Sequence, residues 1–276
     1  MENAISLDQA FQQVGSGLHR MQVMLAVAAS IARCIHGYLV HCFGVLTMEQ
    51  VYLCATAGSS VYQECTATDM CSDDPGIDVK VDESYKYYYN NWHVQMGLSC
   101  KTPIQIGYMA TAYFIGYGFG GYAHAYPDSL GRRKSTIGGL VLALACMTVI
   151  MLVPDYKVRL AGFFLLGLGT VKDVAAPIWV SECVGCDPKD KATAYSITNV
   201  FDAAPVLVVY ACILLGGVNW AYLYFTILGI GYVSLFILFL CPESPEWLLL
   251  KGRREEAIAA FNVIAAWNGR DLIDKD

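Results

Sequence analysis

The sequence predicts an all-α, polytopic membrane protein with six transmembrane helices. The first observation is composition: 56% of the 276 residues are hydrophobic and 15% are charged, whereas soluble proteins carry about 25% charged residues. The second is a series of apolar runs, each close to the roughly 20 residues that a helix needs to cross the hydrocarbon core. The third is a cationic stretch between two such runs, Asp-Ser-Leu-Gly-Arg-Arg-Lys at residues 128–134.

The cationic stretch sets the expected orientation of the chain. Apolar runs at residues 103–126 and 135–154 flank it, and three adjacent cations are costly to place in lipid. We therefore predict a tight turn at a membrane surface, in which Gly131 permits a sharp backbone path. Arg and Lys clustered in a short loop mark the cytoplasmic side, so this turn is expected in the cytoplasm.

The chain is expected to begin with a cytoplasmic N-terminal segment at residues 1–20, because this part is polar and lacks the features of a signal peptide. The first transmembrane helix is predicted at residues 21–46, with Arg33, His36 and His41 inside it. Charged groups within a span usually face a bundle interior or an aqueous cavity. Arg33 is therefore a candidate for a substrate path, with simple pairing to a neighbouring helix as the alternative.

Residues 47–102 are predicted to form an extracytoplasmic, cysteine-bearing loop. The loop is acidic, and four cysteines in a polar loop opposite the basic turn indicate two disulfides in an oxidising compartment. Four cysteines allow three pairings, and the sequence does not choose among them. The disulfide candidates are Cys54, Cys65, Cys71 and Cys100.

Residues 103–241 are predicted to hold transmembrane helices two to six. In the second helix, Gly116 and Gly120 share one face, which indicates close helix packing. Its tyrosines, at residues 108, 113 and 117, would line a cavity or pack in the core or against lipid.

Three further charges fall at membrane depth. Lys172 and Asp173 lie near the middle of the fourth helix, predicted at residues 158–181. Neighbouring helical residues point about 100° apart, so we expect each to need its own partner or water. The fifth helix, residues 192–216, adds Asp202. The substrate-path candidates are therefore Arg33, Lys172, Asp173 and Asp202.

Other chemistry is not expected from this sequence. Cys183 and Cys186 form a lone Cys-x-x-Cys pair, which predicts two reduced cytoplasmic thiols because a zinc site needs further ligands. There is no basic patch with interleaved aromatics for nucleic acid and no hydrolytic or phosphate-binding constellation. We expect no enzyme activity, no metal and no cofactor.

The turn at residues 128–134 resembles the signature loop between the second and third spans of the major facilitator superfamily. Residues 242–257, Pro-Glu-Ser-Pro-Glu-Trp-Leu-Leu-Leu-Lys-Gly-Arg-Arg-Glu-Glu-Ala, resemble the stretch after the sixth span of organic cation and anion transporters and sugar porters. Pro-Ile-Trp-Val-Ser-Glu at residues 177–182 resembles the end of the fourth span in sugar porters. The long cysteine-bearing loop favours the organic ion branch.

The resemblance implies that the six helices form the N-terminal half-bundle of this fold, with residues 242–276 as a cytoplasmic tail. It also implies a cytoplasmic gating network that holds two halves together while the cavity faces outward. Glu246 departs from the family pattern, which has Arg there, and the chain has six expected spans where the family has twelve. The residues assigned to the network are Asp128, Gly131, Arg132, Arg133, Glu182, Glu243 and Arg253.

The expected function is membrane transport of small organic ions by alternating access, with the sign of the substrate charge open. The alternative is a non-transporting accessory or structural subunit of a larger membrane assembly. The expected partners are the lipid bilayer, a small organic ion, and a second transporter half or other membrane subunits, with a hetero-assembly favoured over a homodimer. The expected location is the plasma membrane rather than an organelle.

Overall fold

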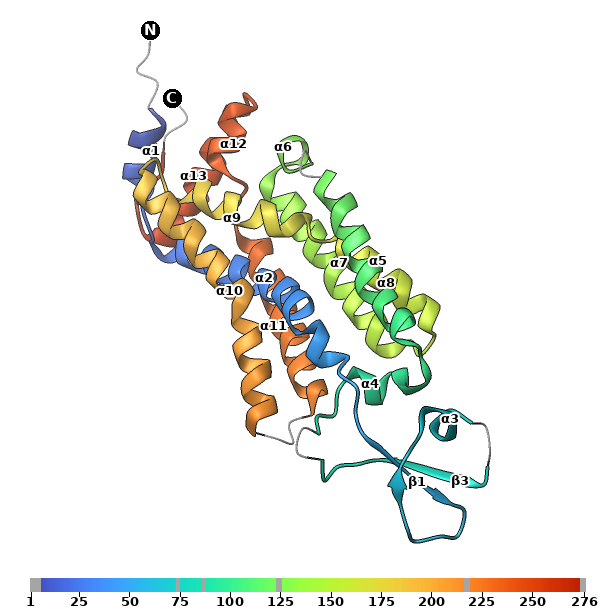
Figure 1. Ribbon diagram of the computed structural model, residues 1–276. Helices are drawn as coiled ribbons and strands as arrows, with labels where there is room; N and C mark the ends of the chain where they lie inside the picture. Colours follow the sequence, from blue (N-terminus) through green and yellow to red (C-terminus); the bar gives the residue numbers. More distant parts are fainter. Residues whose placement is uncertain (1–5, 73–74, 86–87, 123–125, 216–218, 274–276) are drawn as a thin grey trace.

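The computed structural model describes residues 6–72, 75–85, 88–122, 126–215 and 219–273, and these form a helical bundle with a small sheet at one end (Figure 1). Five helical segments of this part are long and apolar enough to cross a membrane. They are α2 (Arg20–Leu46), α7 (Arg132–Leu152), α8 with α9 (Tyr156–Leu168 and Val171–Cys183), α10 (Pro188–Leu215) and α11 (Trp220–Leu240).

A further helix, α5 (Pro103–Tyr122), has the 20-residue length of a span, although it is not among the five candidate spans. It lies along α8 (Figure 1). At Gly116 the two backbones come so close that a Cβ atom would overlap the carbonyl of Phe164. The small residue is therefore needed for this packing, as the sequence pattern predicts.

The fourth span, predicted at residues 158–181, lies within the candidate membrane-crossing segment Tyr156–Cys183, which contains a break that the sequence analysis did not predict. The helix α8 ends at Leu168, and α9 begins at Val171 after a break at Gly169 and Thr170. Figure 1 shows α9 running at an angle to α8. The break moves Lys172 into the first turn of α9, where it packs close to α2 and α7.

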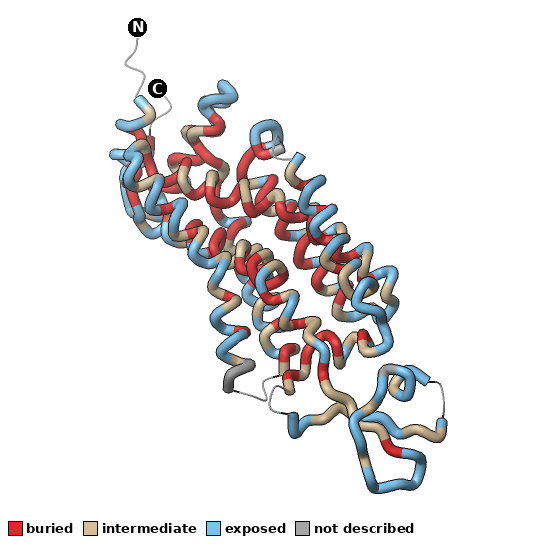
Figure 2. The backbone as a smooth tube through the Cα atoms, viewed as in Figure 1, coloured by how far each residue is buried: buried red, intermediate tan, exposed pale blue. Residues whose placement is uncertain are grey.

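The helix α2 occupies the centre of the bundle, whereas α10 lies at its edge. In their most apolar stretches, 61% of the α2 residues are buried but only 17% of those in α10. Figure 2 shows the same contrast between the bundle interior and the exposed sides of α5 and α10. These exposed sides must face lipid or another polypeptide.

The loop after α2 contains a sheet that the all-helical prediction missed. Strands β1 (Tyr52–Thr56), β2 (Gln63–Glu64) and β3 (Ile77–Val81) pair antiparallel in the order β2-β1-β3. Short helical turns complete the loop: α3 (Ala67–Met70), α4 (Trp92–Gln95) and the 3₁₀ turn Leu98–Cys100. The structure pairs the cysteines as Cys54–Cys65 and Cys71–Cys100.

The opposite end of the bundle, which we call the basic end, carries four short helices (Figure 1). They are α1 (Leu7–Val14), α6 (Tyr126–Leu130), α12 (Pro245–Leu250) and α13 (Arg254–Asn268). The rings of Phe11 and Phe261 pack edge to face at 5.0 Å, and Asn268 donates to the Val14 carbonyl at 3.0 Å. The two ends of the described chain are therefore tied together here.

Helices α2 and α10 approach most closely at Gly37, where a Cβ atom would lie 1.6 Å from the carbonyl oxygen of Asp202. Pro205 lacks an N–H and leaves the Phe201 carbonyl, four residues earlier, without its helical donor. The Cys34 thiol donates to that carbonyl at 3.2 Å. The proline and glycine together therefore place Asp202 against α2.

We predict that Gly37→Ala lowers the stability of the chain by roughly 1–3 kcal/mol or more, because the added methyl must push α10 away from α2. Gly44→Ala is the matched control, since it lies in the same helix with no atom within 4 Å of the new methyl. The measurement is the unfolding temperature in a mild detergent. Equal midpoints for the two variants would contradict the close approach.

Candidate functional site

The four charged candidates for the substrate path meet in one cluster inside the bundle. The Lys172 ammonium lies 2.5 Å from Asp173 Oδ1. Arg33 donates through Nη1 to the main-chain oxygen of Asp173, and its Nη2 lies 3.9 Å from Asp202 Oδ2. Helices α2, α9 and α10 therefore contribute to a single site.

The pairing of Lys172 with Asp173 corrects the expectation that each needs a separate partner. The long Lys172 side chain reaches its neighbour's carboxylate within the first turn of α9, and it is 2% exposed. Mutual pairing of opposite charges offsets part of the cost of removing them from water.

His36 and Tyr113 complete the cluster, although neither was among the candidates. His36 Nδ1 lies 2.6 Å from the Tyr113 hydroxyl and 3.6 Å from Asp173 Oδ2. His41 Nε2 lies 3.8 Å from Asp202 Oδ2. The available signal was spacing, because His36 follows Arg33 by three residues and so shares its helical face.

The cluster retains unused hydrogen-bonding capacity. Three of its buried atoms make no hydrogen bond within the described residues: Arg33 Nε, Asp173 Oδ2 and Asp202 Oδ1. Buried polar atoms are nearly always satisfied, and leaving one unpaired costs roughly 1–3 kcal/mol. One donor and two acceptors therefore remain for a further partner.

An apolar cavity of about 170 Å³ shares Tyr113 with the cluster. It lies among α2, α5 and α8, and aromatic and aliphatic side chains form its walls. It is lined by Leu39, Val40, Phe43, Gly44, Ala110, Tyr113, Phe114 and Phe163.

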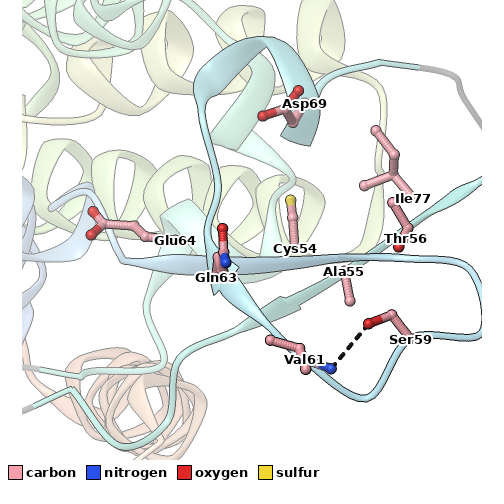
Figure 3. Close-up of a pocket in the computed structure, with 9 residues that line it drawn as sticks. All are labelled: Cys54, Ala55, Thr56, Ser59, Val61, Gln63, Glu64, Asp69 and Ile77. Carbon is pink, nitrogen blue, oxygen red and sulfur yellow. Dashed lines mark hydrogen bonds between the residues drawn. The ribbon is translucent and has the colours of Figure 1, made fainter.

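A larger cavity, of about 440 Å³, lies against the sheet after α2, between β1 and α3 (Figure 3). Its carboxylates are Glu64 and Asp69, and Asp69 already accepts a hydrogen bond from Thr66 at 2.6 Å. None of the path candidates lines it. We therefore place the candidate site at the intramembrane cluster despite its smaller cavity.

A second polar centre, at the basic end, joins α6, α7 and α9. Arg132 donates to the Glu182 carboxylate at 3.0 and 3.2 Å and to Asp128 Oδ1 at 2.5 Å. The Arg132 side chain is 9% exposed and that of Glu182 11%. This bidentate pair is therefore well shielded from water, and it fixes the start of α7 to the end of α9.

The tail joins this centre through Glu243. Its carboxylate accepts from the main-chain N–H of Arg133 at 2.8 Å, in the first turn of α7, where a negative charge is favoured by the helix dipole. Gly131 has φ +107°, and a Cβ atom there would collide with the Glu243 carboxylate. The glycine thus serves both the turn and the approach of the tail.

Two of the assigned network residues act differently from the prediction. The Arg133 guanidinium donates to the Phe239 carbonyl at 2.7 Å rather than to a carboxylate. Arg253 pairs with Glu256 at 2.6 Å, three residues along the chain, and Glu243 acts on it only as a weaker charge interaction. Glu246, where the family pattern has Arg, pairs with Lys191 of α10 at 2.6 Å.

The Cys-x-x-Cys pair lies at the end of α9. Cys183 and Cys186 are both free thiols, and no group of three metal-ligating side chains occurs among the described residues. Burial, followed by the nearby Asp8 charge, raises the pKa of the Cys186 thiol. This favours the protonated form over the thiolate that binds metal.

The amino-acid sequence matches a known family along most of its length. Residues 25–275 match the sugar (and other) transporter family, so the chain belongs to this branch of the major facilitator superfamily. The solved structure of the xylose transporter XylE from E. coli, in a partially occluded inward-open conformation, has the same fold: TM-score 0.55 and 16% identity, covering 91% of this chain and 56% of that one.

Curated relatives come from both the organic ion and the sugar branches. A Xenopus laevis "Solute carrier family 22 member 15-like" protein is 26% identical over 82% of this chain and 47% of its own length. "Organic cation/carnitine transporter 2" of Arabidopsis thaliana is 26% identical over 87% and 47%. "Probable inositol transporter 2" from the same plant is 32% identical over 54% and 26%. The chain thus spans about half the length of the first two.

We predict that Glu182→Gln destabilises the chain by about 1–3 kcal/mol, because it leaves the buried Arg132 guanidinium without its main counter-charge. The matched control is Glu256→Gln, whose ion pair with Arg253 is exposed to water and should therefore change the stability much less. Unfolding midpoints in detergent give the comparison. A Glu256 variant as unstable as the Glu182 variant would contradict the assigned difference in burial.

Proposed function

We propose that this chain is one six-helix body of a transporter that moves small organic ions by alternating access. The observation that carries the proposal is the intramembrane cluster, in which four charges from α2, α9 and α10 are paired but not fully satisfied. Ionisable groups inside a membrane bundle are costly and mark solute or ion pathways. Membership of a transporter family supports the same reading.

The organic ion branch is favoured by two features of this chain. One is the long outer loop with its disulfides, and the other is the charged character of the cluster, which suits an ionic solute better than a neutral sugar. Relatives such as the Arabidopsis "Organic cation/carnitine transporter 2" align along most of the chain.

A second six-helix body is the proposed partner. In transporters built from two repeats, the solute site lies between the halves. Here α10 is little buried, and α5 exposes large apolar side chains such as Phe114 and Phe119. We favour a different polypeptide or segment over a second copy, because nothing in these exposed sides suggests self-complementarity.

The basic end is proposed to be the cytoplasmic gate. The Arg132–Glu182 pair and the Glu243 cap join α7, α9 and the tail, so they can hold the end closed in one state and release it in another. We place the outer sheet outside the cell and the chain in the plasma membrane, because the two disulfides suit an oxidising exterior.

Asp173→Asn should cut uptake much more than surface abundance, since it removes a charge of the cluster but keeps the shape of the side chain. Uptake of labelled tetraethylammonium, 4-aminohippurate and 4-aminobutyrate into cells expressing the chain with its partner gives the measurement. The control is Glu83→Gln, an exposed acidic residue of the outer loop. Unchanged uptake by the Asp173→Asn variant would mean that Asp173 has only a structural role. If neither the parent nor any variant takes up a solute, the result favours an accessory subunit.

The orientation is tested by cysteine labelling of intact cells. A membrane-impermeant maleimide should react with Ser59→Cys in the outer loop and fail to react with Ser129→Cys in the basic turn until the cells are permeabilised. The unsubstituted chain gives the background. Labelling of both positions from outside would show that the proposed topology is wrong.

A further inference from the structure

A groove of about 300 Å³ lies at the basic end, outside the charged cluster. It runs along the first turns of α7 and is bordered by the end of α5 and by the break between α8 and α9. Its walls are mostly apolar, with side chains such as Leu142 and Leu168 and with glycine at residues 120, 138, 139 and 169. Because a glycine projects no side chain into the space, the groove can admit a narrow apolar chain.

Lys134 is the cation of this groove, and it is exposed. The other two cations of the basic turn are used within the protein, Arg132 by two carboxylates and Arg133 by the Phe239 carbonyl. The Lys134 ammonium forms no ion pair and no hydrogen bond with any residue that the structure describes. Its charge is therefore available to an anion.

Ser135 lines the groove beside Lys134 and offers a second polar contact. The residue is 5% exposed, and its Oγ makes no hydrogen bond within the described part of the chain. Buried hydroxyl groups are nearly always satisfied, so this one is available to a ligand in the groove. Both residues lie in the first turn of α7, where the helix dipole also favours a negative charge.

We propose that this groove binds one anionic phospholipid from the leaflet at the basic end. The phosphate lies at Lys134 and Ser135, and one acyl chain follows α7 as far as Leu142. Between Ser135 and Leu142 the helix rises by about 10 Å, which leads from the charged turn into the apolar part of a candidate span. This binding site goes beyond the proposed transport function and does not depend on it.

The combination of one free cation with an apolar groove selects an anionic amphiphile over other ligands. A free phosphate would pair with Lys134 but would leave the groove unused. A zwitterionic lipid would fill the groove but would bring its own cation close to Lys134. Basic pockets between transmembrane helices are typical binding sites for anionic headgroups, and the bilayer supplies such lipids at the depth of this groove.

The test is native mass spectrometry of the full chain in detergent. The chain is titrated with phosphatidylglycerol, with phosphatidylcholine that has the same acyl chains, or with inorganic phosphate. One phosphatidylglycerol should bind about fivefold more tightly than phosphatidylcholine, as expected for one lysine near a membrane surface. Inorganic phosphate at the same concentration should not displace the bound phosphatidylglycerol.

Two changes separate the headgroup from the acyl chain. Lys134→Gln should remove the preference for phosphatidylglycerol, whereas Lys134→Arg should keep it. Gly138→Leu should weaken the binding of both lipids, because the new side chain occupies the groove. A Cβ atom at Gly138 would have no other atom within 4 Å, so the fold has room for this change.

The matched controls lie outside the groove and should bind both lipids as the parent does. Lys157→Gln removes an exposed cation from the first turn of α8. Gly118→Leu alters an exposed glycine of α5 at which a Cβ atom would also have no atom within 4 Å. The unfolding midpoint of each variant is measured alongside, and Lys134→Gln, at a surface position, keeps the test decisive if Gly138→Leu does not fold.

Each part of the assignment has its own contrary result. Equal binding of the two lipids by the parent, or an equal loss of preference in Lys157→Gln and Lys134→Gln, overturns the headgroup contact. Unchanged lipid binding by folded Gly138→Leu overturns the acyl position and favours another occupant, such as a helix of a second body. Displacement of the lipid by inorganic phosphate overturns it in favour of a free-anion site. These measurements involve no solute uptake, so their failure is distinguishable from failure of the proposed function.

Discussion

The structure depends on the need to satisfy four charged side chains inside a membrane. Lipid offers them neither counter-charges nor hydrogen bonds, so α2, α9 and α10 must bring them together. Arg33 is the common member, because it contacts the Asp173 backbone and faces the Asp202 carboxylate. The close approach at Gly37 and the break before α9 are the backbone features that make this meeting possible.

At the basic end, charged side chains are also paired within the protein, but a helix N-terminus replaces one of the cations. Arg132 and Glu182 form a shielded bidentate pair, and Glu243 uses the N-terminus of α7 instead of a cation. One polar centre lies in the bundle and the other at its end, and α9 contributes to both. A tilt of α9 would therefore alter the Asp173 contacts and the Glu182 contacts together, which gives a physical link between the proposed solute site and the proposed gate.

Much of this arrangement could be predicted from the sequence, because apolar runs and charges at depth are strong signals. These signals predict the spans and the basic turn. They also mark Lys172 and Asp173 as charged residues at membrane depth. The pairing of these two residues did not follow, since it depends on the break after α8, which no proline marks. The sheet after α2 was also missed: β1 and β2 show no alternation of apolar and polar residues, and the alternation in β3 covers only the five residues Ile77–Val81. Arg253 was assigned by resemblance alone, and its nearest carboxylate is local.

The most direct test of the central claim is a charge exchange between α2 and α10. Unfolding temperatures of the purified chain would be compared for Arg33→Asp, Asp202→Arg and the double exchange. Each single change places like charges together and should lower the midpoint, while the double change restores an opposite pair and should recover a large part of the loss. If the double variant unfolds at a temperature no higher than that of the less stable single variant, the contact between Arg33 and Asp202 is contradicted.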